Sequence, residues 1–244
     1  METPGNRMGD QLHEGKAKVL FATDDPGLLI QYFKDDATAF NGKMKGTIKD
    51  KGVCNNSISS NIFLMLQARG VKTHFVRKLS EREMVVTKVQ IIPVEVVIRN
   101  IVAGSLAKRM GAPTGQKLPE PIIELYYKDD DLGDPMINRG HVRAFSLASD
   151  AEMDFIEKEA LRINELLVEF FSDIGLTLVD YKLEFGRGPE GILLADEISP
   201  DGCRLWDTNS GEILDKDRFR QDLGNLTETY QEVSRRVSST VKQT

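Results

Sequence analysis

The chain contains few of the residues from which disulfide scaffolds and metal clusters are built. Its 244 residues include two cysteines and three histidines. Two cysteines cannot form a disulfide framework, and the histidines have neither the spacing of a zinc site nor the partners of a catalytic triad. We therefore expect Cys54 and Cys203 to be free thiols in a reducing compartment, and the histidines to be surface or packing residues.

Long apolar runs and a basic charge are also lacking. No apolar run approaches the roughly 20 residues that a membrane-spanning helix needs, and the N-terminal segment lacks the apolar core of a signal peptide. The formal net charge of -6 argues against a nucleic-acid-binding surface. These absences predict a cytoplasmic protein that binds neither membranes nor nucleic acids.

The glycine-rich signatures of nucleotide-binding loops are missing as well. Neither a Walker loop nor a dinucleotide fingerprint occurs in the sequence. Two lysines, Lys16 and Lys18, open the first expected strand instead, and strand alternation puts them on one face. There they could reach nucleotide phosphates, although a polar outer face is the alternative interpretation.

The pattern of apolar residues indicates an α+β protein. Hydrophobic residues make up 40% of the chain and charged residues 29%, as in ordinary globular proteins. After a polar and poorly ordered lead-in over residues 1–11, the first half predicts a mostly antiparallel sheet with one helix. The expected elements are strands at 16–21, 28–33, 73–77, 84–88 and 94–102, and a helix over 53–69 that Gly70 ends.

The second half begins with a long helix. Ser149 and Glu152 form a capping box, and apolar residues then step by three and four up to Gly175. Strands at 177–185 and 192–198 and a last helix over 226–237 come next. Because Pro93 interrupts the extended region, we expect a boundary there, between a β-rich N-terminal lobe (1–92) and a larger α+β lobe (93–244).

The strand over residues 177–185 carries charges on one face only. Asp180, Lys182 and Glu184 alternate with apolar residues, so they share the face opposite the core. A solvated charge ladder would look the same. The next strand favours a functional site, because Asp196 and Glu197 end an apolar run and buried carboxylates need cations or donors. Glu184 and Asp196 on adjacent strands would suit Mg²⁺ that bridges nucleotide phosphates.

Basic residues in three further segments suit anionic ligands. Arg99 interrupts an apolar strand and needs an anionic partner, and Ser105 could cap the short helix that comes after it; a buried ion pair is the alternative. Arg204 has the planar fork that binds carboxylates or phosphates. The residues expected in its loop are Ser199, Asp201, Arg204 and Asp207, with Trp206 as a core anchor. The basic run of Lys216, Arg218 and Arg220 is more typical of a solvated helix face.

Taken together and in order, these segments resemble the SAICAR synthetase family over residues 12–238. The matching stretches are Gly15-Lys-Ala-Lys18, Pro93-Val-Glu-Val-Val-Ile-Arg-Asn100 with Ala103-Gly-Ser105, Asp180-Tyr-Lys-Leu-Glu-Phe-Gly186, Asp196-Glu-Ile-Ser-Pro-Asp201 with Arg204-Leu-Trp-Asp207, and Asp215-Lys-Asp-Arg-Phe-Arg220. Asn41 and the pair Gly202-Cys203 depart from the family pattern.

The resemblance implies a two-lobed fold related to ATP-grasp and protein-kinase-like enzymes, with ATP in the cleft. It implies a homodimeric, ATP- and Mg²⁺-dependent ligase of purine biosynthesis that joins L-aspartate to carboxyaminoimidazole ribonucleotide (CAIR), giving SAICAR, ADP and phosphate. The reaction would pass through an acyl phosphate, and we expect residues 35–51 and 128–142 to close over it.

The resemblance also assigns roles to individual residues. ATP would be bound by Lys16, Ala17, Lys18, Lys88, Ile91, Glu184 and Asp196, of which Glu184 and Asp196 would hold the metal. The ribonucleotide would be bound by Arg99, Ser105, Asp180, Lys182, Asp201, Arg204 and Arg220, with Lys182, Asp180 and Arg204 as the catalytic residues. A small-molecule kinase of the inositol-polyphosphate type and a non-catalytic nucleotide-binding regulator are the alternatives.

Overall fold

A computed structural model describes residues 5, 7–39 and 44–241. Its strands are β1 (Met8–Glu14), β2 (Lys18–Thr23), β3 (Leu28–Phe33), β4 (Asp36–Ala39), β5 (Met44–Thr47), β6 (Phe75–Lys78), β7 (Glu83–Thr87), β8 (Gln90–Ile101), β9 (Lys117–Tyr127), β10 (Met136–Ile137), β11 (Leu176–Gly188), β12 (Gly191–Ala195) and β13 (Cys203–Asp207). Its helices are α1 (Lys51–Ala68), α2 (Gly104–Met110), α3 (Arg139–Ala144), α4 (Asp150–Asp173), α5 (Asp217–Arg220) and α6 (Leu226–Val241). The prediction of mixed α and β structure is confirmed.

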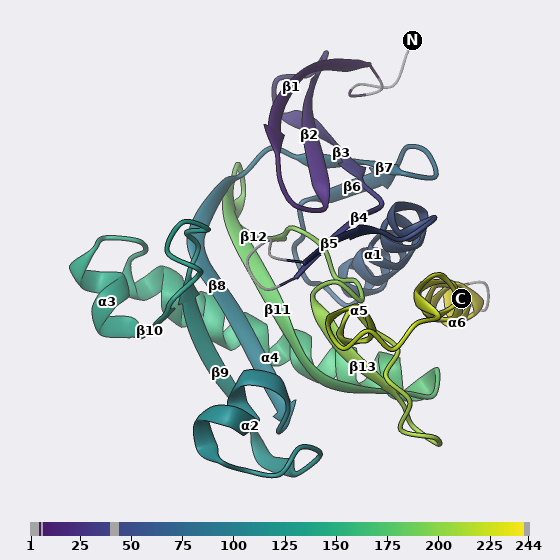
Figure 1. The fold of residues 1–244 in the computed structure, drawn as a ribbon. Coiled ribbons are helices and arrows are strands. Elements are labelled where there is room, and N and C mark those ends of the chain that lie inside the picture. The colour runs from purple at the N-terminus through teal and green to yellow at the C-terminus, as the bar shows by residue number, and fades with distance from the viewer. Residues whose placement is uncertain (1–4, 6, 40–43, 242–244) are drawn as a thin grey trace.

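Two antiparallel sheets dominate the fold (Figure 1). The upper sheet has the strand order β1-β2-β3-β7-β6. The lower sheet has the order β10-β9-β8-β11-β12, and β13 also pairs with β11. Strands β4 and β5 form a separate two-stranded sheet. The upper sheet is thus built from strands that precede Lys88 in the chain, and the lower sheet from strands that begin at Gln90.

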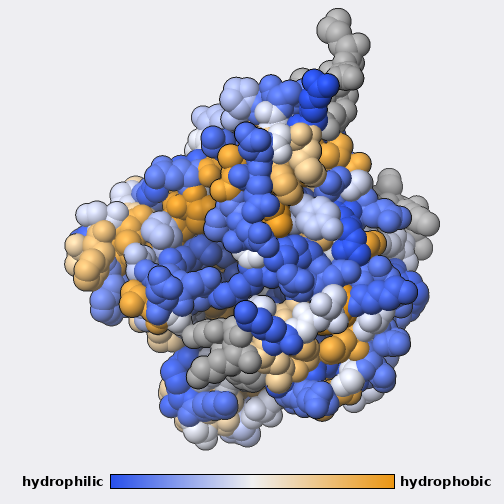
Figure 2. All heavy atoms as spheres, turned by 45° about the horizontal axis from the view of Figure 1, so that its top comes forward, coloured by the Kyte–Doolittle hydropathy of each residue, from blue (hydrophilic) through white to orange (hydrophobic). Residues whose placement is uncertain are grey.

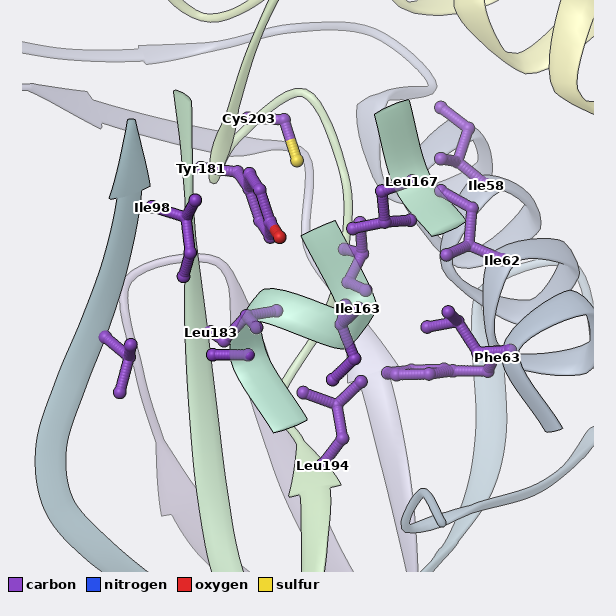
Figure 3. Packing of buried hydrophobic residues seen from close by; sticks show 14 of the residues in the cluster. Ile58, Ile62, Phe63, Ile98, Ile163, Leu167, Tyr181, Leu183, Leu194 and Cys203 are labelled. Atoms are coloured by element: carbon purple, nitrogen blue, oxygen red, sulfur yellow. The ribbon is translucent and has the colours of Figure 1, made fainter. Parts of the chain in front are cut away.

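Helix α4 lies behind the lower sheet and forms much of the core (Figure 1). Its capping box is present: the Ser149 side chain accepts a hydrogen bond from the Glu152 N–H. Ile163 and Leu167 of α4 face Tyr181 and Leu183 of β11 on one side, and α1 on the other (Figure 3). The apolar face of β11 is therefore buried against α4, which leaves its charged face for the opposite side of the sheet.

Helix α1 follows the predicted pattern of a helix ended by glycine. Gly70 follows the C-cap residue Arg69 and has a φ of 80°, a conformation that residues with a side chain rarely adopt. Gly52, in its first turn, lies against β3, where an added Cβ atom would be 2.3 Å from the carbonyl oxygen of Phe33. The start of α1 is therefore fixed closely against the upper sheet.

Three expectations about extended segments are wrong. Residues 8–14 form β1 and are not a disordered lead-in, because their backbone pairs with β2 although their side chains are exposed. Strand β8 runs through Pro93, which lies where the pairing with β11 shifts register, so its missing N–H is tolerated. Strand β9 was not expected, because its prolines and exposed side chains conceal the strand pattern.

The segment after β12 also differs from expectation. The strand ends at Ala195, and Asp196 takes a left-handed backbone conformation with a φ of 65°. Arg204 and Asp207 belong to β13 and not to a loop, since their backbones pair with β11. Trp206 is only half-buried and packs at the edge of the sheet against Val179 and its neighbours.

Two further local predictions fail. Ser105 does not cap α2; the N-cap is Ala103, and no side chain makes the cap hydrogen bond. Arg218 is buried and donates to Glu212 at 2.8 Å and to backbone carbonyl oxygens, so the basic run is not a solvated helix face. Both cysteines are free, as expected, and both are buried. No helix among the described residues is long and apolar enough to cross a membrane.

Candidate active site

Two adjoining cavities lie where the upper sheet meets the charged face of the lower sheet. The first cavity, of about 580 Å³, lies under the upper sheet, and the second, of about 420 Å³, lies over β8, β11 and β13. Figure 2 shows a hollow on this side of the molecule that is rimmed largely by hydrophilic residues. The residues that line both cavities are Glu95, Asp134, Lys182, Asp201 and Gly202. A reacting group bound at this junction could be contacted by the ligands of both cavities.

The first cavity combines an apolar wall with a charged floor. Its apolar residues are Leu20, Leu29, Val86, Val89 and Ile91, and its charged residues include Lys16, Lys18, Lys128, Lys182, Glu184 and Asp196. An aromatic base would find apolar contacts on one side, and phosphates would find lysines on the other. This arrangement suits a nucleoside polyphosphate.

Lysines neutralise the carboxylates on the floor of the first cavity. Lys182 Nζ lies 2.9 Å from Glu184 Oε1 and 3.9 Å from Asp196 Oδ2. Lys18 forms an ion pair with Asp196, and its Nζ lies 3.2 Å from Glu197 Oε1. The predicted requirement of these carboxylates for cations is therefore met within the protein.

The same contacts determine the charge state of the cluster. Burial disfavours the charged form of Asp196, but attraction to Lys18 and Lys182 outweighs it and holds the pKa of that carboxyl well below its usual value. Burial also opposes the charge of Lys182, whereas attraction to Glu184 and Glu95 raises the pKa of its ammonium well above the usual value. The Asp196 carboxylate and the Lys182 ammonium are thus both charged at neutral pH.

Glu184 and Asp196 are suited to hold Mg²⁺. No cluster of three or more His, Cys, Asp or Glu side chains with metal-site geometry exists among the described residues. Mg²⁺, however, commonly takes only one or two carboxylates and completes its octahedron with waters and phosphate oxygens. Both carboxylates lie within 4 Å of the Lys182 ammonium, so they converge on one region of the first cavity. The donor set fits a metal that arrives with a nucleotide.

The second cavity is built around Asp180, which lies between two arginines. Arg99 Nη1 and Arg204 Nη1 each lie 2.8 Å from Asp180 Oδ2. Arg99 also donates to Glu124 at 2.7 Å and to the Ser105 hydroxyl at 3.0 Å. The alternative of a buried ion pair for Arg99 is therefore present, but its partners line a cavity in which an anion could share the same donors.

Arg204 is held on both sides. Its Nε donates to Asp217 at 2.6 Å, and Arg220 pairs with the same carboxylate. Gly104 lies against the guanidinium, and a Cβ atom there would be 2.6 Å from Nη2 of Arg204. The glycine therefore leaves the space that the arginine needs. Three arginines converge here with two aspartates, an arrangement that can bind a phosphate group.

The structure brings most of the predicted site residues together. The first cavity is lined by Lys16, Ala17, Lys18, Ile91, Glu184 and Asp196. The second is lined by Arg99, Ser105, Asp180, Arg204 and Arg220, and Lys182 and Asp201 line both. Lys88 lines neither cavity; its backbone N–H donates to Gly27. Asn41 lies outside the described residues, whereas Gly202 and Cys203 both line the second cavity.

Sequence reasoning missed several charged residues of the site, among them Lys128, Glu95 and Glu124. Lys128 lies 2.7 Å from Glu184, Glu95 lies 3.0 Å from Lys182, and Glu124 bonds to Arg99. Glu95 interrupts an apolar strand as Arg99 does, so the same signal could have identified it. Glu124 lies in β9 and Lys128 directly follows it, so without that strand nothing indicated their position. His74, expected to be a surface or a packing residue, is buried and packs edge-on against Phe63.

Comparisons with known proteins agree with this geometry. The family model described as SAICAR synthetase matches residues 11–237. The phosphoribosylaminoimidazole-succinocarboxamide synthase of Magnetococcus marinus is 58% identical over 94% of this chain and 96% of its own length. That of Clostridium botulinum (strain Loch Maree / Type A3) is 55% identical over 94% of this chain and 98% of its own length.

Solved structures are similar to this chain as well. The crystal structure of the Ehrlichia chaffeensis synthase superposes with a TM-score of 0.92, at 47% identity, over 94% of this chain and 98% of that one. A SAICAR synthetase in complex with ADP gives a TM-score of 0.91 at 48% identity, over 94% and 98% of the two chains. The predicted resemblance is confirmed, and the chain belongs to the SAICAR synthetase family.

Proposed function

We propose that the chain is the ATP-dependent ligase that joins L-aspartate to carboxyaminoimidazole ribonucleotide, releasing ADP and phosphate, in purine biosynthesis. One observation carries this proposal beyond family membership. Lys182 stands at the junction of a cavity suited to a nucleoside polyphosphate and a cavity rich in arginine, within 3.0 Å of Glu95 and Glu184. The two substrates that must exchange a phosphoryl group would meet there.

The reaction needs activation of a carboxylate, because a carboxylate is a poor electrophile. The γ-phosphoryl group of ATP would pass to a carboxylate oxygen of the ribonucleotide; the new O–P bond replaces the bond to the β-phosphate, and ADP leaves. The amine of aspartate would then attack the carbonyl carbon, form the amide bond, lose a proton and expel phosphate. Both steps depend on positioning and charge neutralisation rather than on a protein nucleophile.

The chain's own residues can supply that positioning. Lys18 and Lys182 carry positive charge beside the expected phosphates, and Arg99 and Arg204 carry it beside the ribonucleotide. Glu184 and Asp196 would hold Mg²⁺, which when bound neutralises phosphate charge. Each of these carboxylates is paired with a lysine in the absence of ligand. On binding, the metal would replace the lysines at the carboxylates, and the phosphates would replace the carboxylates at the lysines.

The finer architectural expectations belong to the same proposal. The upper sheet would form the N-terminal lobe (1–92) and the lower sheet the core of the larger lobe (93–244), in an ATP-grasp or protein-kinase-like arrangement with ATP between them. We further propose that the enzyme is a cytoplasmic homodimer that uses ATP, Mg²⁺, CAIR and L-aspartate. Sedimentation of the purified protein tests the dimer, and a sedimenting monomer at micromolar concentration would contradict it.

The direct test measures ADP release by the purified protein with ATP, Mg²⁺ and CAIR, with and without L-aspartate. We expect ADP release that depends on aspartate, with one succinocarboxamide product formed for each ADP. ADP release independent of aspartate would favour a small-molecule kinase. ATP binding without turnover would favour a regulator.

A further inference from the structure

A lysine lies fully buried beneath the junction of the two cavities. The Lys51 side chain, in the first turn of α1, has 0% of its surface exposed and forms an ion pair with Asp201 Oδ2. Asn55, one turn later, donates to the same oxygen at 3.1 Å. The Tyr230 hydroxyl of α6 donates to Asp201 Oδ1 at 2.6 Å. Both oxygens of Asp201 are thus bound by side chains of α1 and α6 that line neither cavity.

Asp201 belongs to the turn that supports the junction. The Ser199 hydroxyl accepts a hydrogen bond from the Asp201 N–H at 3.2 Å, and the Gly202 carbonyl oxygen accepts one from the Lys182 N–H at 3.1 Å. Gly202 also lies against the stem of Lys182, where an added Cβ atom would be 3.3 Å from Cγ. Any shift of Asp201 would therefore be transmitted to Lys182 and, two residues into β13, to Arg204.

The position of Lys51 is itself fixed. Gly52 lies against the Phe33 carbonyl, so α1 cannot slide along the upper sheet without losing this contact. The Ser59 hydroxyl, two turns along α1, donates to the carbonyl oxygen of Ile198 at 3.1 Å. Helix α1 therefore contacts residues 198–201 at two points, through the hydrogen bond from Ser59 to Ile198 and through the ion pair of Lys51 with Asp201.

The stability of the fold alone does not account for this pair. Removing two charges from water costs about as much as their attraction returns, and well-packed apolar residues often serve stability as well or better. A buried pair does fix one geometry, because alternatives leave a charge without a partner. We propose that Lys51 is a positioning residue for the ligase reaction: through Asp201 it fixes the turn 199–202, and hence the placement of Lys182 and Arg204. This inference rests on the proposed function.

If the Lys51 ammonium is removed, the charges that remain around Asp201 determine how the turn 199–202 would move. Burial opposes the charge of Asp201, while Lys51 and then Lys216 attract it. Lys216 lines the first cavity, and its backbone N–H donates to the Pro200 carbonyl oxygen of the same turn. Without the Lys51 ammonium, the Asp201 carboxylate would turn toward Lys216 and water, and the turn 199–202 would move toward the cavities. Binding of the ribonucleotide and transfer to it should suffer, whereas the apolar wall that faces the nucleotide base should not.

The test uses the full chain with Lys51→Met, which preserves the length of the side chain and removes its charge. We expect kcat/KM for CAIR to fall about tenfold or more, while KM for ATP stays within about threefold of wild type. Lys51→Arg should recover part of the loss. Arg162→Met is the matched control, because Arg162 pairs with Glu159 on α4 and lines neither cavity; it should change neither constant. A Lys51→Met protein with a lowered melting temperature but wild-type kcat and KM values would overturn the proposal.

Two further measurements keep the outcome decisive. If Lys51→Met does not fold, Tyr230→Phe removes one hydrogen bond to the same carboxylate and keeps the ring; it should raise KM for CAIR about threefold, and an unchanged value would overturn the proposal.

Hydrogen exchange reports on the turn independently of the reaction. The amides of Gly202 and Cys203, which donate to Ser199 at 3.0 and 2.9 Å, should exchange faster in the variants. Wild-type protein without aspartate-dependent turnover would refute the proposed function, and unchanged exchange in the variants would refute the positioning role.

Discussion

The Lys128 ammonium lies 2.7 Å from Glu184 Oε1, the oxygen that also accepts a hydrogen bond from Lys182 at 2.9 Å. Lys182 of β11 and Lys128, which directly follows β9, thus converge on one carboxylate that is proposed to hold Mg²⁺. A metal ion at this oxygen would replace one or both ammonium groups, which would then be free to contact phosphates. Binding of the metal ion and release of the lysines from Glu184 would therefore occur together.

Glu184→Gln should abolish most of the turnover with little effect on the fold. The amide keeps the size and some of the hydrogen bonding but loses the charge that attracts Mg²⁺. We expect kcat to fall about a hundredfold and the Mg²⁺ concentration needed for half-maximal ATP binding to rise, as measured by calorimetry. Glu212→Gln, which removes an exposed partner of Arg218, is the control and should resemble wild type. Full activity of Glu184→Gln would refute the metal assignment.

Arg204→Lys should weaken binding of the ribonucleotide more than binding of ATP. Lysine keeps the positive charge but cannot contact Asp217 and Asp180 at once, as the guanidinium does at 2.6 and 2.8 Å. We expect KM for CAIR to rise about tenfold and KM for ATP to stay near the wild-type value. Steady-state kinetics with one substrate varied at a time measures both. An effect confined to ATP would place Arg204 outside the ribonucleotide site.

ATP with Mg²⁺ should slow hydrogen exchange in residues 128–142. In this segment Lys128 pairs with Glu184, and Asp130 pairs with Lys16 at 2.6 Å across the first cavity. Phosphates would compete for both lysines and order the segment around the nucleotide. We expect exchange about tenfold slower there, and a similar change in the described part of residues 35–51. Unchanged protection in both segments would exclude them as the closing elements.

Glu152 gives a prediction for stability and pH that is independent of the site. Its hydrogen bond with Arg187, together with that from Ser149, lowers its pKa from 4.5 to about 2. Because this pKa is lower in the folded state, the stabilisation is present above pH 4.5 and is lost as the pH falls toward about 2. The pair is partly exposed, so Glu152→Gln should lower the free energy of unfolding by at most about 1 kcal/mol near neutral pH.

The pH dependence itself distinguishes this origin from a general weakening. Urea titrations of wild type and Glu152→Gln should give unfolding free energies that differ at neutral pH and converge as the pH approaches about 2. Ser149→Ala removes the cap by another route and provides a comparison whose effect should not vanish with acid. A constant difference for Glu152→Gln across this range would contradict the role of its charge.

Much of the site was predictable because strand alternation is a local rule. Asp180, Lys182 and Glu184 had to share a face of β11, and Tyr181 and Leu183 had to face the core, whatever the neighbouring strands were. The helix from the capping box to Gly175 was equally local. Strand β9 could not be predicted locally, because its two prolines disfavour a strand and only its pairing with β8 makes it one. Glu124 and Lys128 were therefore missed as well.

Signals that lie within a few residues were enough to predict helices α1, α4 and α6, the charged face of β11, and the motifs that indicate the family. Which charges meet depends on the tertiary structure. Lys18 and Asp196 are 178 residues apart in sequence, and Lys51 and Asp201 are 150 apart, yet each pair is in direct contact. Coulomb attraction and the cost of desolvation depend on distance and burial in space, which sequence spacing does not encode. The partners of the site residues therefore became visible only in the folded chain.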